Sequence, residues 1–290
     1  MGHHFVPQAY LRCFENPSRP GFIWLHSKRD PMPRQASIEQ AAQSRGYYSS
    51  TDEEALATFV EAPANPLLAK LRRLERLSED ERLVVAYYIA TMIKRVPRQR
   101  LLATSLIGPA LETVVARVRD QLTELFQTGK LSVDGLASRM DELARLHAKY
   151  EAEPPQEVES QVRDPLPTEV LFSAVASMKW WVIRAREPDH FVTSDSPAYF
   201  HSSYGVGQPR AEIRFPLSPQ IAIHGSRVNR TGPGIEFVPR FIERSWVREF
   251  NRSQGCGATS LLLADRPLPF AAALLRRGPT DLTHLVWTSG

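Results

Sequence analysis

The strongest constraint on the fold is a change of pattern part-way along the chain. A stretch with four prolines and several acids, residues 151–167, separates a first part with helical periodicity from a later part with short apolar runs. Chains that group their helices first and their strands later favour α+β architectures over alternating α/β ones. We therefore predict an α+β fold with a helical first half and a mixed or antiparallel sheet drawn mainly from the second half.

The first part contains one helix with a well-defined start. Ser78 and Glu81 have the spacing of a capping box, and apolar residues recur at helical intervals over residues 83–90. Arg95-Val96-Pro97 should end or kink this helix. Two long amphipathic helices are predicted to follow, at residues 111–126 and 133–150.

The later part is dominated by short β-like runs separated by turns that contain Pro and Gly, at residues 180–183, 191–193, 213–215, 221–223 and 260–264. We expect residues 1–150 to form a mainly helical part that includes the N-terminal motif and one short strand. Residues 168–290 should form a β-rich part, with 151–167 as an exposed linker. The two parts either form separate domains or interlock in one.

Composition excludes several classes of protein. The 290 residues include only two cysteines, too few for a disulfide framework or a cysteine zinc site. No uninterrupted apolar run approaches the roughly 18 residues of a membrane span, and the opening residues lack the pattern of a signal peptide. We therefore expect a cytoplasmic protein with no membrane contact. The net charge of +4 is too small to require a nucleic-acid partner by itself.

Adjacent histidines near the N-terminus, His3 and His4, are an unusual feature. Neutral imidazole is a good metal ligand and a general base near neutral pH. In an extended chain the two rings point to opposite faces, so one metal could take both only at a turn. The alternative is structural: His3 lies at a frayed terminus and His4 is a core histidine with satisfied hydrogen bonds.

A second polar segment, Ser194-Asp195-Ser196-Pro197, ends an apolar run abruptly. Residues at strand ends are often displayed in a cleft, where Asp195 could ligate a metal, orient a histidine or act as a base. The alternative is an Asx-turn in which the carboxylate binds nearby backbone N–H groups. Arg95, at a helix end, is either an anion site or a complement to the helix dipole.

Sequence motifs of several enzyme classes are absent. The chain has no phosphate-binding G-x-x-x-x-G-K-[ST] motif, no dinucleotide-binding G-x-G-x-x-G after a strand and no G-x-S-x-G nucleophile turn. The opening HHFVP is superficially similar to the start of His-Asn-His nucleases. The later Asn and His of that unit do not follow at close spacing, so this similarity is weak.

The ordered set of motifs resembles the Domain of Unknown Function 4238 family. The set consists of HHFVPQAYLRCF at 3–14, RVP at 95–97, TSDSP at 193–197, FPLSP at 215–219 and a helix asparagine at 251. The resemblance covers nearly the whole chain. It implies no settled activity, but it groups the polar residues His3, His4, Gln8, Tyr10, Arg95, Ser194, Asp195 and Asn251 as a candidate site.

From these residues we predict a hydrolase, namely a metal-assisted phosphodiesterase or nuclease. His4, Asp195 and His3 are the candidate catalytic residues, and His4 and Asp195 would also ligate a divalent metal. The candidate substrate-binding residues are Arg95, Gln8, Tyr10, Ser194 and Asn251.

Two other functions stay open: a non-catalytic module that binds nucleic acid or another phosphate-bearing ligand, and a purely structural role for the motifs. Convergence of the motifs in an open cleft would favour catalysis or binding. Full burial with satisfied hydrogen bonds would favour the structural role.

Overall fold

The computed structural model describes residues 2–30, 32–200, 208–228 and 232–276. Residues 277–290, the end of the predicted β-rich part, therefore lie outside the described residues. The chain divides into two compact units, one made of residues 1–99 with 165–290 and the other of residues 100–164. This division differs from the predicted boundary near residues 151–167, because strands from both parts of the sequence pair within the first unit.

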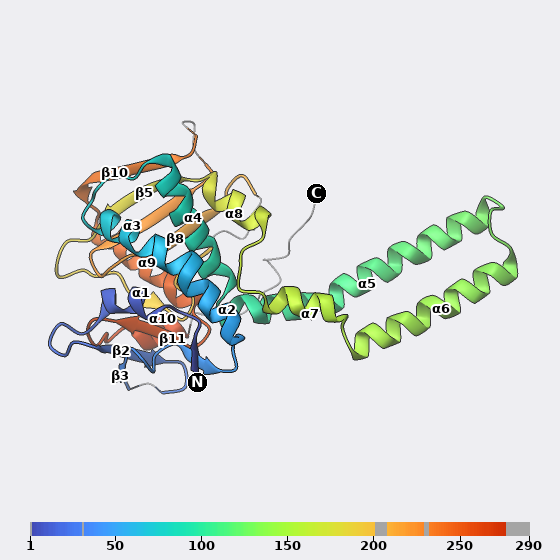
Figure 1. The fold of residues 1–290 in the computed structure, drawn as a ribbon, viewed down its shortest axis with the longest axis horizontal. Coiled ribbons are helices and arrows are strands. Elements are labelled where there is room, and N and C mark those ends of the chain that lie inside the picture. The colour runs from blue at the N-terminus through green and yellow to red at the C-terminus, as the bar shows by residue number, and fades with distance from the viewer. Residues whose placement is uncertain (1, 31, 201–207, 229–231, 277–290) are drawn as a thin grey trace. The chain divides into compact units, whose positions relative to one another are not determined.

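A four-stranded antiparallel sheet joins the start and the end of the chain (Figure 1). Leu262 lies opposite His26 and Ser194 in the register, so these side chains share one face of the sheet. A separate two-stranded antiparallel ribbon pairs β1 (Gly2–His4) with β4 (Gln43–Arg45). The strand order of the four-stranded sheet is β3 (Arg34–Ser37), β2 (Phe22–Ser27), β11 (Leu261–Ala264) and β6 (Thr193–Ser194).

A five-stranded sheet is built entirely from the later part of the chain. Its β10 and β5 strands are parallel, and its other neighbouring strands are antiparallel. The predicted α+β class with mixed and antiparallel sheets is therefore confirmed. The strand order is β10 (Gly234–Phe241), β5 (Lys179–Arg184), β9 (Ile221–Ser226), β8 (Glu212–Pro216) and β7 (Tyr199–Phe200).

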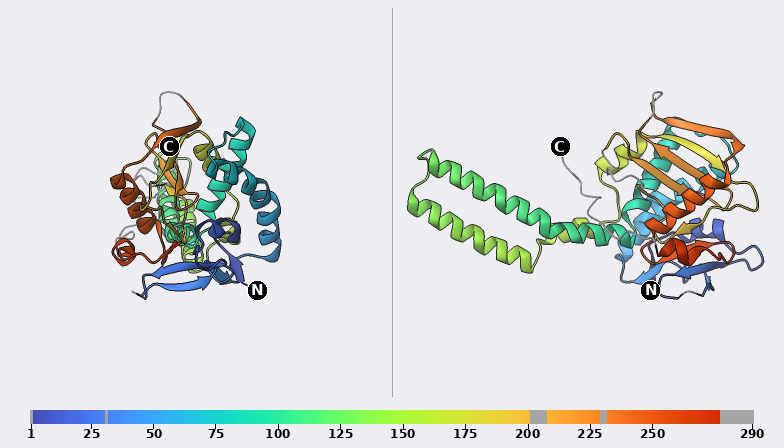
Figure 2. Two further views of the ribbon diagram at one scale, coloured as in Figure 1. Left: turned by 90° about the vertical axis from the view of Figure 1, so that its left-hand side faces the viewer. Right: turned by 180° about the vertical axis from the view of Figure 1, so that it is seen from behind.

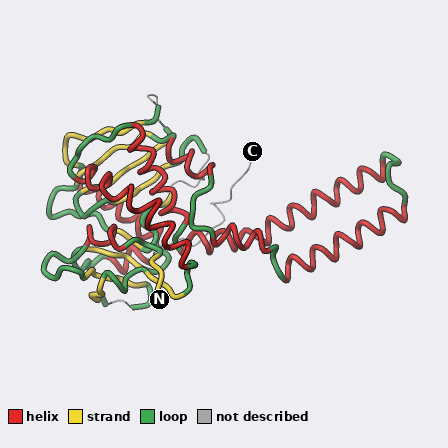
Figure 3. The backbone as a smooth tube through the Cα atoms, in the orientation of Figure 1, coloured by secondary structure: helices red, strands yellow, loops and turns green. Residues whose placement is uncertain are grey.

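Helices pack against these sheets (Figure 3). The predicted capping box is present at the start of α4, where Ser78 and Glu81 satisfy each other's backbone N–H groups. The helical segments of the first unit are α1 (Gln8–Leu11), η1 (Arg12–Phe14), α2 (Ser50–Ala55), η2 (Leu56–Glu61), α3 (Ala62–Arg72), α4 (Glu79–Lys94), α8 (Glu169–Ala176), α9 (Arg244–Gly257) and α10 (Ala271–Leu275).

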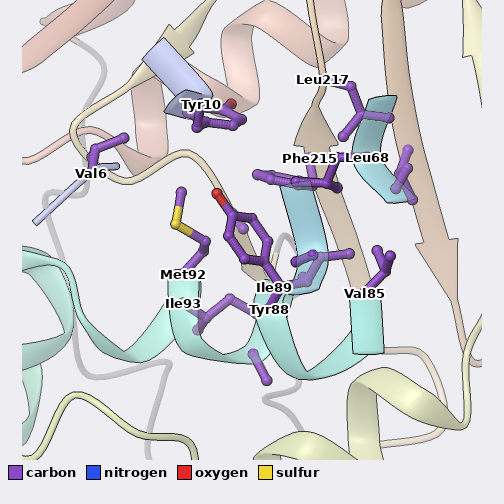
Figure 4. Close-up of a cluster of buried hydrophobic side chains, with 14 of the residues drawn as sticks. Val6, Tyr10, Leu68, Val85, Tyr88, Ile89, Met92, Ile93, Phe215 and Leu217 are labelled. Atoms are coloured by element: carbon purple, nitrogen blue, oxygen red, sulfur yellow. The ribbon is translucent and has the colours of Figure 1, made fainter. Parts of the chain in front are cut away.

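The five-stranded sheet buries both faces. Trp180 and Val182 of β5 enter the main core, which also contains α4 side chains, whereas Ile183 packs with Val247 and Phe250 of α9. Because alternate strand residues point to opposite faces, α4 and α9 cover opposite sides of this sheet (Figure 2). Figure 4 shows α4 side chains around Phe215 in the main core.

The second unit is helical, with α5 (Pro97–Gln127) entering it, followed by α6 (Val133–Ala152) and α7 (Gln156–Arg163). The predicted linker is wrong in one respect, because α7 lies within it. Pro155 stands at the N-cap, outside the helical hydrogen bonds, and Glu157 and Glu159 in the first turn favour the helix dipole.

Candidate functional site

The two N-terminal histidines have different partners. Nδ1 of His3 accepts the backbone N–H of Tyr48 at 3.1 Å, and its Nε2 lies 3.5 Å from a carboxylate oxygen of Glu53. Nε2 of His4 donates to the carbonyl of Glu39 at 2.9 Å. Both residues lie in β1, whose extended geometry sends their rings to opposite faces. Each ring is therefore held by its own surroundings, and the two do not form a joint ligand pair.

Arg95 is buried against the N-terminal motif, with its side chain 2% exposed. Its Nη1 donates to Glu61 at 2.7 Å and its Nη2 donates to the carbonyl of His4 at 2.6 Å. Burial works against its charge, but Glu61 outweighs burial and the pKa of Arg95 is raised. The guanidinium predicted to bind a phosphate is thus neutralised by a carboxylate of its own chain. The Gln8 amide nitrogen lies 3.4 Å from Nε2 of His4.

Tyr10 joins three of the signature motifs. Its hydroxyl donates to the carbonyl of Pro216 at 2.8 Å and lies 2.8 Å from Oγ1 of Thr193, from which it accepts. Its ring stacks on Phe215 with centroids 5.3 Å apart (Figure 4). Burial is the main cause of the raised pKa of Tyr10. The motifs therefore do converge, but here they converge inside the core.

Asp195 fastens β6 to the chain that leads into β11. Its carboxylate accepts the backbone N–H groups of Thr259, Ser260 and Leu261 at 2.7–3.0 Å, and the Ser260 hydroxyl at 3.0 Å. Asp195 is 1% exposed, and burial raises its pKa despite these four donors. The alternative of an Asx-turn is therefore wrong in its partners: the carboxylate does bind backbone N–H groups, but they lie 64–66 residues away in the sequence.

Ser194 and Asn251 tie the same strand to α9. The Ser194 hydroxyl donates to Oε1 of Gln254 at 3.2 Å. Asn251 accepts the N–H of Val192 at 3.0 Å and donates to the carbonyl of His190 at 2.7 Å. Sequence reasoning missed Gln254, although its position three residues after Asn251 places both on one side of the helix.

These contacts place the predicted site residues in an N-terminal group and a β6–α9 group, which are joined through the contact of Tyr10 with Thr193. Among the described residues, no hydrogen bond or ion pair joins His4 to Asp195. The same part of the chain has no group of three or more His, Cys, Asp or Glu side chains placed to hold a metal ion. The predicted partnership of His4 and Asp195 therefore has no support in these contacts. The burial of Tyr10, Arg95, Ser194, Asp195 and Asn251 favours a structural role for these residues, whereas His3, His4 and Gln8 are only partly buried.

Another histidine forms the arrangement expected of a general base. Nδ1 of His190 lies 3.1 Å from Oδ2 of Asp265, and their side chains are 4% and 8% exposed. Nε2 of His190 is buried without a hydrogen-bond partner. Burial opposes ionisation of Asp265, but His190 and Arg266 outweigh it and lower its pKa. Sequence reasoning missed this pair. His190 directly precedes the apolar run at residues 191–193, and Asp265 directly follows the apolar run at residues 260–264.

The five-stranded sheet carries a row of aromatic rings at its α9 side. Trp181 of β5 and His224 of β9 are paired in the register, with ring centroids 5.8 Å apart. His224 is in turn 6.0 Å from the ring of Trp246 in α9. Trp246 is 50% exposed. Sequence reasoning missed this row, whose signal is the tandem Trp180-Trp181 in one strand.

Arginines gather around Phe241, where β10 ends and α9 begins. Phe241 pairs with Arg184, which strand alternation places on the face of the sheet opposite that of Trp181. Phe241 is 43% exposed, and the guanidinium carbons of Arg184 and Arg186 lie 4.8 Å and 5.1 Å from its ring centroid. Exposed Arg240 directly precedes Phe241, and exposed Arg248 follows in α9. We group the aromatic row and these arginines, which come from both faces of the sheet near the start of α9, under the name aromatic–arginine surface, defined by Trp181, Arg184, Arg186, His224, Arg240, Phe241, Trp246 and Arg248.

A cavity of about 250 Å³ lies elsewhere, against the end of β2. Its walls include His26, Ser27 and Asp30, with the rest contributed by prolines and aliphatic residues. The buried His26 ring accepts the N–H of Leu268 at 3.3 Å, and burial lowers its pKa. None of the predicted site residues lines this cavity.

The ordered motifs and their shared contacts agree with the comparison of sequences. Residues 2–266 match the family described as "Protein of unknown function (DUF4238)". The chain belongs to this family. The resemblance seen in the motifs is thereby confirmed. No curated protein and no solved structure matches the chain. The family description names no activity, so the function has to be argued from the geometry.

Proposed function

We propose that this protein is a non-catalytic module that binds single-stranded nucleic acid on the aromatic–arginine surface. The observation that carries the proposal is the exposure of Trp246 and Phe241, at 50% and 43%, with the guanidinium groups of Arg184 and Arg186 over the Phe241 ring. Large aromatic rings left partly in water are common where a ligand covers them.

Stacking accounts for the preference for single strands. Unpaired bases present π-faces that stack on aromatic side chains, and each such contact is worth about 1–3 kcal/mol. A duplex hides those faces between its own base pairs. Three neighbouring rings, Trp181, His224 and Trp246, offer a row on which an unpaired strand would lie.

The charge of the surface suits a phosphate backbone. Arg184, Arg186, Arg240 and Arg248 have no carboxylate partner among the described residues. Of the acids close to them in the chain, Glu249 binds Arg214 and Arg252 and Glu236 binds Lys179, whereas exposed Glu187 and Glu243 form no ion pair among the described residues. The four arginines outnumber these two unpaired acids and leave a net positive charge to face an anionic ligand.

Fluorescence anisotropy with a labelled single-stranded oligonucleotide tests the proposal. Trp246→Ala should weaken binding by about 1–3 kcal/mol, which is roughly 5- to 150-fold. Phe270→Ala is the matched control, because Phe270 is 45% exposed and lies outside the surface. Equal affinity of both variants, or preference for a duplex over a single strand, would contradict the proposal.

A second candidate is phosphodiester hydrolysis, favoured by the His190–Asp265 pair. The carboxylate would orient the imidazole, whose free Nε2 would take a proton from the attacking water. The neighbouring Asp189 forms an ion pair of 3.0 Å with Arg244 at the start of α9, close in the chain to the aromatic–arginine surface. A nuclease assay with several divalent metals should then give cleavage that His190→Ala abolishes. Cleavage that survives this substitution would exclude the pair as the catalytic base.

A further inference from the structure

The cavity of about 250 Å³ beside β2 has walls from two distant parts of the chain. One wall comes from the end of β2 and from the connection to β3, with Asp30 and Pro33. The other comes from residues 267–275 and includes Ala272 and Leu275 of α10. The volume exceeds the roughly 150 Å³ of an apolar cavity that holds benzene. A ligand with one ring and a short side chain would therefore fit.

The walls of this cavity are mostly apolar and poor in hydrogen-bond donors. Pro33, Pro267 and Pro269 have no backbone N–H, and the N–H of Leu268 is already donated to the ring of His26 at 3.3 Å. Burial lowers the pKa of His26, so its ring is neutral at neutral pH. The cavity therefore suits a ligand that has an apolar body and supplies its own hydrogen-bond donors.

Two polar side chains on the wall can accept hydrogen bonds from a ligand. Oδ1 of Asp30 accepts the N–H of Met32 at 3.0 Å, and its other carboxylate oxygen has no partner among the described residues. Oγ of Ser27 accepts the N–H of Arg29 at 3.1 Å, and a hydroxyl oxygen has a second lone pair. A carboxylate oxygen and a hydroxyl oxygen are thus left for the ligand.

The charge on the wall is negative. Among the described residues that line the cavity there is no Lys or Arg, so with His26 neutral the one charged side chain is Asp30. The nearby cation of Lys28 donates to a backbone carbonyl at 2.9 Å, and Arg266 lies 3.3 Å from the carboxylate of its neighbour in the sequence. Exposed Arg29 and Arg34 do not line the cavity. A phosphate or carboxylate ligand would therefore meet the Asp30 carboxylate with no cation on the wall to balance it.

We propose that this cavity binds a small primary amine, with its ammonium group at Asp30 and Ser27 and its apolar body between the prolines and α10. An ammonium group brings three donors, and its charge complements the carboxylate. A metal ion is disfavoured, because the described part of the chain holds no group of three or more His, Cys, Asp or Glu side chains that could bind one. The cavity shares no residue with the aromatic–arginine surface, so the amine is a second ligand, independent of nucleic acid.

Isothermal titration calorimetry of the full chain with phenethylamine tests this proposal without nucleic acid in the assay. Phenethylamine should bind, and phenylacetate, which is similar in size but carries a carboxylate, should bind at least about 10-fold more weakly. Asp30→Asn keeps the oxygen that accepts the Met32 N–H but removes the charge, and should weaken phenethylamine binding by about 10-fold. Asp120→Asn makes the same change at an exposed position in α5 and should leave the affinity unchanged.

A second pair of variants tests the position of the ligand. Ala272→Phe places a ring in the cavity and should abolish binding, whereas Ala273→Phe makes the same change at the next, exposed position of α10 and should retain it. Wild-type protein that leaves phenethylamine unbound, or binds phenylacetate as tightly, would overturn the proposal. So would equal affinities of wild type and Asp30→Asn, or of the two Ala→Phe variants. If Ala272→Phe unfolds the protein, the comparison of Asp30→Asn with Asp120→Asn decides.

Discussion

Replacing Asp195 with Asn should destabilise the fold, because the carboxylate accepts four hydrogen bonds in a site that is 1% exposed. The Asn amide oxygen can take over the bonds from Ser260 and Leu261, but its NH₂ group then faces the N–H of Thr259. An orphaned buried donor costs about 1–3 kcal/mol, and the remaining bonds weaken as they lose a charged acceptor. Since the buried charge is also removed, we expect a net loss of about 2–4 kcal/mol in unfolding free energy.

Urea denaturation at neutral pH, with the slope compared between proteins, measures this loss directly. Ser260→Ala is the graded control, because it removes one donor and leaves three, and it should cost about 0.5–1.5 kcal/mol. An Asp195→Asn protein as stable as wild type, but defective in binding or hydrolysis, would refute the structural role and restore Asp195 as a functional residue.

Three further substitutions probe the buried contacts. Tyr10→Phe leaves two buried oxygens without their hydroxyl partner and should cost about 1–3 kcal/mol by urea denaturation; an unchanged midpoint would contradict the bonding described. Arg95→Met should lower the unfolding free energy by about 3–5 kcal/mol, because it leaves Glu61 without its partner. Adding Glu61→Gln should regain part of that loss. An equal loss in the double variant would contradict an ion-pair origin. The lowered pKa of Asp265 means that its contribution to stability is present above its unfolded pKa of about 3.9 and lost as pH falls through the folded value. Between pH 7 and pH 3, the unfolding free energy of the wild type should therefore fall more than that of Asp265→Asn, which lacks the charged partner of His190. Parallel plots of unfolding free energy against pH for the two proteins would contradict this.

Local signals in the sequence predicted the elements that depend on neighbouring residues. The capping box at Ser78 and Glu81 marks the start of α4 correctly, because both partners lie within one turn. The turn from Phe215 to Pro219 connects β8 and β9 as an antiparallel pair, since a short turn leaves few other pairings.

Non-local pairing explains why the predicted domain boundary differs from the observed units. The pairing of β2 with β11 joins residues more than two hundred positions apart, and nothing near Phe22 indicates its partner. The α7 helix within residues 151–167 depends on neighbouring residues, but there the local signal is ambiguous. Two prolines in succession are compatible with the start of a helix and equally typical of a loop, so they do not distinguish the two.

The candidate site could be located only in part, because the same residue types serve catalysis and internal hydrogen bonding. The sequence placed Asp195 at the end of an apolar run, but its partners at residues 259–261 come from a different strand connection. Strand alternation implies that Trp180 and Trp181 face opposite ways, but which face stays accessible depends on how α9 packs.

The salt dependence of single-strand binding tests the central claim most directly. If Arg184, Arg186, Arg240 and Arg248 each contact one phosphate, the logarithm of the association constant should fall against the logarithm of salt concentration with a slope of about −2.8. Arg240→Ala should reduce the magnitude of that slope by about 0.7, whereas Arg45→Ala, at an exposed position in β4, should leave it unchanged. A slope near zero, or equal slopes for the two variants, would contradict nucleic-acid binding at the aromatic–arginine surface.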